Sequence, residues 1–429
     1  MSTEAQLLLV RLGCLREAAL RSWITRPDFE VAVAESGTAA HLRLADRQVV
    51  LSPERSADEI YEACRAALAA APGRKGVIGF LDSVLPVVAR LAAEFGIPGC
   101  SPEVLANLTD KSWARARFAE RSVPGPGFRV LDAAVGSRSE RERLVAGLAY
   151  PLIIKPADSS AGRGVIRADG PESLSAAWDT AAGFTKSGTL LAEEEMHGDE
   201  VSVESVTVGG RTSIIAVTEK TTTRGESFVE MGHALPARLE PAVAGEIRRV
   251  VPAALAALGY DHGIAHTELI LTASGPRIIE VNPRPAGDCI LDLLRAATGT
   301  DLYGVAADLA LGLPVDLDAL GSLEFTGGAA IRFLGAEPGI VRRIDGVAEV
   351  SRLLDSAVER LVLLSRPGDL LAPVTTNLHR PGYVLTVGRD TAEAVERAER
   401  FASMISIETS AQVDGEQRPH RLPSSECWT

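Results

Sequence analysis

The segment from Ala265 to Asp288, "AHTELILTASGPRIIEVNPRPAGD", constrains the fold more than any other part of the chain. Two apolar runs flank the turn "TASGP", a pattern that predicts a β-hairpin. Because side chains alternate faces along a strand, Glu280 and Asn282 point the same way, and the hairpin brings Glu268 opposite them. Neighbouring carboxylates repel one another, so this arrangement requires a cation.

The oxygen atoms of Glu268, Glu280 and Asn282 are hard ligands that suit Mg²⁺, with Mn²⁺ as an alternative. Arg284 follows between two prolines that fix its backbone, and its guanidinium suits bidentate binding of a phosphate or carboxylate. We interpret the hairpin as a metal–phosphate clamp. His262 and His266 have an H-x-x-x-H spacing, but neither a helix nor a third ligand supports zinc, so we expect both to be structural.

The segment "PLIIKPADSSAGRGVIRA" joins a buried-type strand, a lysine and a loop of small residues. Small residues let backbone N–H groups approach an anion closely, and Lys155 adds a positive charge at the strand end. The pattern favours a phosphate-binding loop, with candidate contacts at Ser159, Ser160, Gly162 and Gly164. A glycine-rich hairpin with an exposed lysine is the alternative. A Walker P-loop is excluded because its glycine–lysine spacing is missing.

Two further polar segments are ambiguous by themselves. Lys111 lies in the helical stretch "LTDKSWARARF", where a surface lysine is the default. In "LLAEEEMHGDEVSVES", acidic residues surround a His-Gly turn between two strands. They form either a solvated charge cluster or a nucleotide hinge. In a hinge, backbone groups from Glu193 through Glu194 to Met196 would bind adenine, and Glu200 would accept hydrogen bonds from ribose hydroxyls.

The segment "EKTTTRGESFVEMGHALPA" is too polar for a core and is expected to be a loop. It contains Lys220, Arg224, Glu230 and His233. A lone histidine there would usually be a structural surface residue. Next to Glu230 and Gly232, His233 becomes a candidate substrate contact.

Composition narrows the class of protein. A net charge of −13 and an aromatic content of 4% argue against nucleic-acid binding and against a polybasic membrane surface. The N-terminus shows no signal peptide, and we expect no membrane span because apolar runs stay short. Five scattered cysteines read as reduced thiols, so the chain is expected to be cytoplasmic. The first strand is not followed by G-x-G-x-x-G, which disfavours a nicotinamide dehydrogenase.

With these segments in this order, the chain resembles the ATP-grasp enzymes over roughly residues 105–300. The resemblance implies an α/β (α+β) fold in which two subdomains hold ATP. It implies an open α/β domain at residues 1–105, subdomains at 106–190 and 191–310, a C-terminal α+β segment at 311–407 and a flexible tail at 408–429.

The same resemblance implies roles for the candidate residues. Lys111 and Lys155 would contact the ATP phosphates, and the loop Asp158–Gly164 would close over them. Adenine would lie at Glu193 and Met196, with ribose at Glu200. The magnesium ions would be held by Glu268, Glu280 and Asn282.

A narrower resemblance is to the ATP-grasp L-amino acid ligases, carried by "FVEMGHALPA", "EVNPRPAGD" and the C-terminal "RPGYVLTVGRDTAEAVERA". It implies that Glu230 and His233 face the first amino acid and that Arg284 grips its carboxylate or acyl phosphate. Gly287 and Asp288 would line the pocket, where the acid could favour an amine or cationic partner. Lys155, Arg284, Glu230 and His233 would carry catalysis.

The implied activity is ATP-dependent joining of a small-molecule carboxylate and an amine through an acyl phosphate, with release of ADP and phosphate. A homodimer is the family expectation. Two alternatives stay open. One is an ATP-grasp carboxylase or a purine-biosynthesis-type ligase. The other is an ATP-binding regulatory protein without turnover.

Overall fold

The computed structural model describes residues 5–13, 17–36, 40–52, 55–160, 162–223, 228–354 and 359–410. Parts of the segments discussed above lie outside the described residues. They are Ala161, Arg224 with its neighbours, and residues 411–429. Within the described residues, no helix is both long and apolar enough to cross a membrane.

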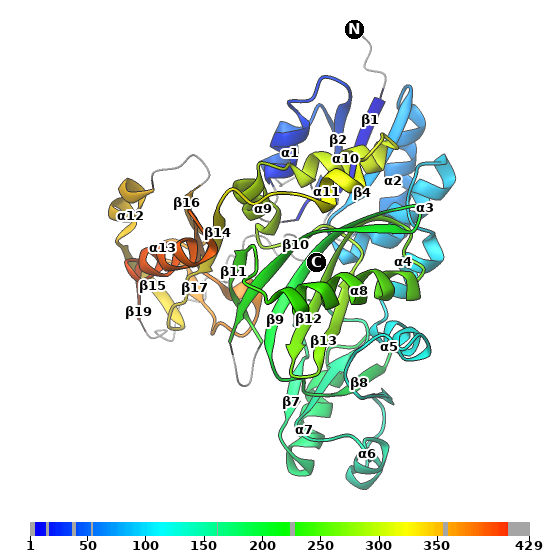
Figure 1. Cartoon of the computed structure of the whole chain (residues 1–429), viewed down its shortest axis with the longest axis vertical. Coiled ribbons are helices and arrows are strands. Elements are labelled where there is room, and N and C mark those ends of the chain that lie inside the picture. The colour runs from blue at the N-terminus through cyan, green and yellow to red at the C-terminus, as the bar shows by residue number, and fades with distance from the viewer. Residues whose placement is uncertain are drawn as a thin grey trace.

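The N-terminal region is an open sheet of four parallel strands in the order β3-β2-β1-β4 (Figure 1). Its elements are β1 (Ala5–Val10), α1 (Glu17–Trp23), β2 (Glu30–Ser36), η1 (Ala40–Leu44), β3 (Arg47–Leu51), α2 (Ala57–Ala70), β4 (Arg74–Gly79), η2 (Asp82–Val84) and α3 (Leu85–Phe95). The continuous apolar run of β1 is buried because helices cover both faces. One face packs on α2 and α3, and the other on α1 and the distant α10 (Leu302–Leu311).

A second, antiparallel sheet follows, in the order β5-β8-β6-β7. The region comprises α4 (Pro102–Leu108), α5 (Lys111–Glu120), β5 (Phe128–Asp132), α6 (Arg138–Leu144), β6 (Leu152–Pro156), β7 (Ile166–Ala168), α7 (Pro171–Ala182) and β8 (Thr189–Glu194). The apolar side of α7, with Trp178 at its centre, packs against this sheet and forms a separate core. The glycine-rich segment connects β6 to β7, as the sequence predicted.

The largest sheet has eight antiparallel strands in the order β13-β12-β9-β10-β11-β14-β18-β16. Its strands are β9 (Asp199–Val208), β10 (Arg211–Thr222), β11 (Glu230–Leu235), β12 (His262–Thr272), β13 (Gly275–Asn282), β14 (Gly328–Phe333), β16 (Arg360–Leu363) and β18 (Gly382–Gly388). Helix α8 (Pro241–Ala257) covers one face of β9, β10, β12 and β13. Because β11 pairs with β14, the sheet continues across the predicted division at residue 310.

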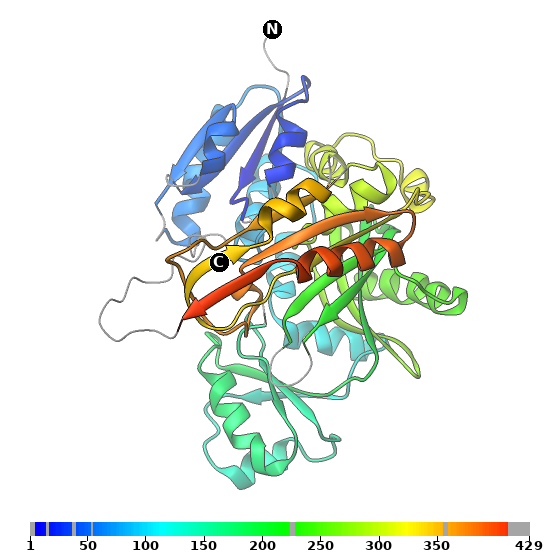
Figure 2. The same cartoon turned by 90° about the vertical axis from the view of Figure 1, so that its left-hand side faces the viewer.

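The remaining elements complete the C-terminal region (Figure 2). They are α9 (Ile290–Thr298), α11 (Leu317–Gly321), β15 (Gly339–Asp345), α12 (Val347–Leu353), β17 (Leu370–Leu371), η3 (Asn377–His379), α13 (Thr391–Ser403) and β19 (Ser406–Ser410). Strands β17, β15 and β19 form a small antiparallel sheet. Residues 408–410, which we expected to begin a tail, belong to β19. Asp390 caps α13, and Thr391 is the first residue of that helix.

Candidate active site

The predicted hairpin is formed by β12 and β13. Its register places Glu268 directly opposite Glu280 and His266 opposite Asn282. On the other side of β12, Ser202 of β9 faces Glu268 and Glu204 faces His266. One face of the large sheet therefore gathers three oxygen-donor side chains, as predicted, together with a histidine and a further glutamate. The donor set suits Mg²⁺, although the role of these residues as ligands stays a prediction.

Lys111 is not an ordinary surface lysine. Its ammonium lies 3.0 Å from Glu280 Oε1 and donates a 2.5 Å hydrogen bond to the Ser159 carbonyl oxygen. Lys111 thus connects the start of α5 with both the metal hairpin and the glycine loop. Asp158 at the start of that loop accepts hydrogen bonds from the Lys186 and Ser187 amides. These contacts tie the base of the loop to the turn before β8.

The glycine loop itself has the backbone that its composition suggested. Gly162 and Gly164 have φ values of 72° and 74°, in the left-handed region that glycine adopts without strain. Ser159 and Ser160 are half-buried on its first arm. Contact of these four residues with phosphate stays a prediction.

Lys155 and Glu193 form a buried ion pair, with Lys155 Nζ 2.7 Å from Glu193 Oε2. Arg115 of α5 binds the same carboxylate through Nε at 2.6 Å and Nη2 at 3.2 Å. Burial alone would raise the pKa of Glu193, but the charges of Arg115 and Lys155 lower it to about 2. Burial lowers the pKa of Lys155, and Glu193 offsets this only in part.

The carboxylate of Glu193 is therefore occupied by Lys155 and Arg115, which leaves the backbone groups of this segment for the predicted contact with adenine. Glu194 turns the other way, where its Oε1 accepts a hydrogen bond from the Ala149 amide at 2.9 Å. Met196 is half-buried at the end of the hinge. Adenine binding by backbone groups of this segment stays a prediction.

Lys220 on β10 is a site residue that sequence analysis mentioned but did not assign. Its ammonium lies 2.6 Å from Glu200, 2.5 Å from Glu230 and 3.4 Å from Glu268, and its side chain is 1% exposed. Burial would lower the pKa of Lys220, but the three carboxylates raise it well above its ordinary value. The single positive charge of Lys220 is thus shared by the predicted ribose residue Glu200, the predicted substrate residue Glu230 and the predicted metal ligand Glu268.

His266 was expected to be structural, yet it touches the predicted metal ligand. Its Nδ1 is 2.7 Å from Glu204 Oε1, and its Nε2 is 3.3 Å from Glu268 Oε1. Burial opposes protonation, but Glu204 and Glu268 raise the pKa of His266 to about 10. His262, at the start of β12, has no such contact among the hydrogen bonds of the described residues.

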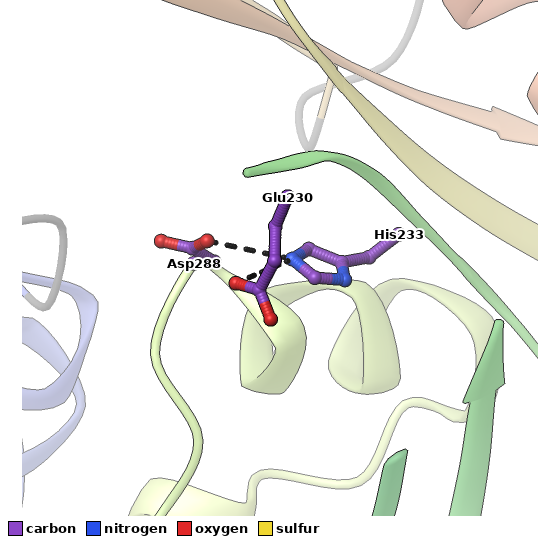
Figure 3. A group of neighbouring side chains, drawn as sticks. All are labelled: Glu230, His233 and Asp288. Atoms are coloured by element: carbon purple, nitrogen blue, oxygen red, sulfur yellow. Dashed lines mark hydrogen bonds and ion pairs between the residues drawn. The ribbon is translucent and has the colours of Figure 1, made fainter. Parts of the chain in front are cut away.

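Glu230 and His233 lie on strand β11 and not in a loop, and His233 is only 2% exposed. His233 Nε2 points toward Asp288 at 3.4 Å and toward Glu230 at 3.8 Å (Figure 3). The ligand atoms of these three residues lie within 4.8 Å of one another, a spacing that could hold a metal ion. Cationic side chains of the chain already face two of the three residues, because Lys220 lies against Glu230 and Arg380 against Asp288.

The C-terminal region supplies two residues to this end of the site. Arg380 donates to both carboxylate oxygens of Asp288, at 2.7 and 2.8 Å, and to the Glu230 carbonyl oxygen at 2.8 Å. Asn377 donates to the Glu230 carboxylate at 2.9 Å. Asp288 is therefore already paired, and an amine or cationic partner would have to compete with Arg380 for its carboxylate.

Arg284 is also engaged by a protein carboxylate. Its Nε and Nη2 lie 2.6 and 3.0 Å from the two oxygens of Asp82, which belongs to η2 of the N-terminal region. The bidentate geometry that the sequence predicted is present, but the carboxylate comes from the chain itself. A substrate carboxylate would have to share or replace Asp82. Gly287 lies between Arg284 and Asp288, in the turn that leads to α9.

Two parts of the chain match models of known protein families. Residues 148–292 match the model of the ATP-grasp domain, and residues 332–410 match that of the L-amino acid ligase C-terminal domain 2. The L-amino acid ligase of Bacillus licheniformis superposes with a TM-score of 0.81 at 21% identity, covering 96% of this chain and 100% of that one. At this identity the superposition shows a shared fold.

Two curated relatives are 28% identical to the chain. Carnosine synthase 1 of Gallus gallus matches over 260 residues, 55% of this chain and 27% of the relative. The formate-dependent phosphoribosylglycinamide formyltransferase of Cupriavidus taiwanensis matches over 268 residues, which are 60% of this chain and 62% of the relative. The match with the first three curated relatives spans between 27% and 65% of the length of each relative.

Residues 148–292 are an ATP-grasp domain, and the chain as a whole has the fold of the solved L-amino acid ligase. Residues 332–410 match the C-terminal domain of the L-amino acid ligases, and the chain is similar to carnosine synthase 1 over 55% of its length. The ATP-grasp fold and the resemblance to L-amino acid ligases, both predicted from sequence, are confirmed.

Proposed function

We propose that the protein is an ATP-dependent carboxylate–amine ligase that forms an amide bond between amino acids or amino-acid-like metabolites. The observation that carries this proposal is the link between Glu230, Asp288 and the C-terminal residues Asn377 and Arg380. The region that matches the L-amino acid ligase domain thereby completes the end of the site that adjoins the metal hairpin.

The first step activates the carboxylate. Its oxygen attacks the γ-phosphorus of ATP, ADP leaves, and an acyl phosphate forms. Lys111 and Lys155 would offset the negative charge of the phosphates, and the glycine loop would exclude water, which hydrolyses acyl phosphates. Mg²⁺, held by Glu268, Glu280 and Asn282, would neutralise phosphate charge when bound.

The second step joins the amine. Its nitrogen attacks the acyl carbon, the C–O bond to phosphate breaks, and the nitrogen loses a proton. Arg284 would stabilise the oxygen that becomes negative, once Asp82 no longer occupies its guanidinium. Glu230 and His233, whose side chains lie 3.8 Å apart, are the candidate proton acceptors. Lys220 would keep the neighbouring carboxylates from repelling the substrate.

The test is phosphate release from ATP and Mg²⁺ with single and paired amino acids, followed by mass spectrometry of the products. Phosphate release with a new amide mass would establish the ligase and name its substrates. Turnover only with bicarbonate or formate and a ribonucleotide amine would instead support the activity class of the formyltransferase relatives. Nucleotide binding without turnover under any condition would favour a regulatory protein.

The expected homodimer and the expected cytoplasmic location remain predictions. Light scattering after size-exclusion chromatography measures the first, and cell fractionation the second.

A further inference from the structure

Arg115 is a buried arginine that the proposed mechanism does not use. It lies on α5, is 3% exposed, and places its guanidinium between strand β8 of the second sheet and strand β13 of the large sheet. On one side it binds both oxygens of Glu193 on β8. On the other side it donates to the carbonyl oxygens of Ile278 at 3.0 Å and Ile279 at 2.5 Å on β13.

These contacts fix the frame of the nucleotide site. Ile279 is the residue immediately before the predicted metal ligand Glu280. Lys111, one helical turn before Arg115, binds Glu280 itself. Helix α5 therefore holds β13 at two points, through a side chain and through the backbone, while its arginine also holds the carboxylate that supports Lys155.

Arg115 also changes the charge of this site. A buried Lys155–Glu193 pair would be neutral by itself. With Arg115 sharing the carboxylate, the three groups carry a net charge of +1, and Lys155 keeps part of its attraction for an anion. In agreement, Arg115 opposes the effect of Glu193 on the pKa of Lys155.

We propose that Arg115 is a positioning residue that sets both the spacing and the net positive charge of the site for nucleotide phosphates. It does so by sharing Glu193 with Lys155 and by anchoring the backbone of β13 directly before Glu280. This inference rests on the proposed function, because it requires ATP to bind between Lys155 and the metal hairpin.

The test compares Arg115→Met and Arg115→Lys with a matched control, Arg141→Met. Arg141 is likewise buried, and it binds two backbone carbonyl oxygens and the carboxylate of Asp179, but it lies in α6 on the outer side of the second sheet. Calorimetry of ADP and a non-hydrolysable ATP analogue at several Mg²⁺ concentrations gives the affinity of each full-length variant. Thermal unfolding gives its stability.

We expect Arg115→Met to weaken nucleotide binding by about tenfold or more and to raise the Mg²⁺ concentration needed for half-maximal binding. Arg115→Lys restores the charge but not all of the hydrogen bonds, so it should bind with intermediate affinity. Arg141→Met should lose stability while its nucleotide affinity stays within about twofold of wild type.

An Arg115→Met variant with the nucleotide affinity and Mg²⁺ dependence of the wild type would overturn the inference and leave the proposed function intact. If Arg115→Met does not fold, Arg115→Lys still decides the matter, because its affinity is compared with the same control. If the wild type binds no nucleotide in the presence of Mg²⁺, both the proposed function and this inference fail.

Discussion

Arg380→Met should be strongly destabilising, because it breaks a buried ion pair on one side only. The side chains of Arg380 and Asp288 are 1% and 9% exposed. Loss of the guanidinium leaves the Asp288 carboxylate without its main partner, which typically costs about 3–5 kcal/mol. The carbonyl oxygens of Glu230 and Asn377 also lose donors, at about 1 kcal/mol each.

The backbone beside this pair adds to the effect. Asp288 and Cys289 have φ values of 50° and 62°, which residues with side chains rarely adopt. Such a conformation persists where surrounding contacts hold it, and the bidentate bond from Arg380 is the strongest contact of Asp288. We therefore expect the turn at Gly287 to relax in the variant, with a higher KM for the carboxylate substrate.

The assay is a double-mutant cycle with Asp288→Asn, measured by urea denaturation followed by circular dichroism. Each single variant leaves one buried charge unpaired, whereas the double variant leaves none. The double variant should therefore lose less stability than the sum of the singles, by about 3 kcal/mol. Additivity within about 0.5 kcal/mol would show that the two charges do not depend on each other and would refute the reasoning.

Three other predictions concern the nucleotide and metal end of the site. Glu280→Gln should abolish turnover and weaken Mg²⁺ binding, with the unfolding temperature near that of wild type; wild-type kinetics at all Mg²⁺ concentrations would mean that the metal site is misplaced. Lys155→Ala should abolish ATP turnover in the phosphate-release assay without preventing folding, and substantial residual turnover would exclude a role in phosphate binding. The pKa of His266 is raised to about 10 in the folded state, against about 6.5 unfolded, so its contribution to stability is complete below about pH 6.5 and is lost as the pH rises through about 10. Denaturation at pH 7 and pH 10 gives the free energy of unfolding at each pH. From pH 7 to pH 10 this free energy should fall more in the wild type than in His266→Gln, and an equal fall in both proteins would contradict the prediction.

The local features of the site could be predicted from the sequence because short spacings determine them. Alternation along β12 and β13 was enough to place Glu268 opposite Glu280. The order strand, lysine, small residues, strand was enough to place the glycine loop between β6 and β7.

The partners of these residues could not be predicted, because they come from distant parts of the chain. Asp82 lies 202 residues before Arg284, Arg380 lies 92 residues after Asp288, and Arg115 lies 78 residues before Glu193. Hydrophobic periodicity specifies which face of a helix or strand is buried, but it does not specify which charged side chain from another element packs against that face. The C-terminal segment that supported the resemblance begins with Arg380. The sequence therefore drew attention to this residue but did not show that it contacts Asp288.

The same limit explains why the partners of two further charged residues were missed. Glu193 sits in a run of acids that looks solvent-exposed, but strand alternation turns its carboxylate inward, toward Arg115 and Lys155. His266 looked like a structural histidine, because its partner Glu204 is on β9, which pairs with β12 only in the folded sheet.

The continuous pairing of β10, β11, β14 and β18 has a consequence for protein engineering. Glu230 and His233 are carried by the strand that pairs directly with β14, and β14 begins at Gly328, before the matched C-terminal domain. A chimera that exchanges residues 332–410 between related ligases would cut through this strand, and with it replace Asn377 and Arg380 while keeping Glu230 and Asp288. We therefore expect a chimera to take on the substrate preference of its donor only when β11, the turn at Asp288 and the C-terminal region all come from the same ligase.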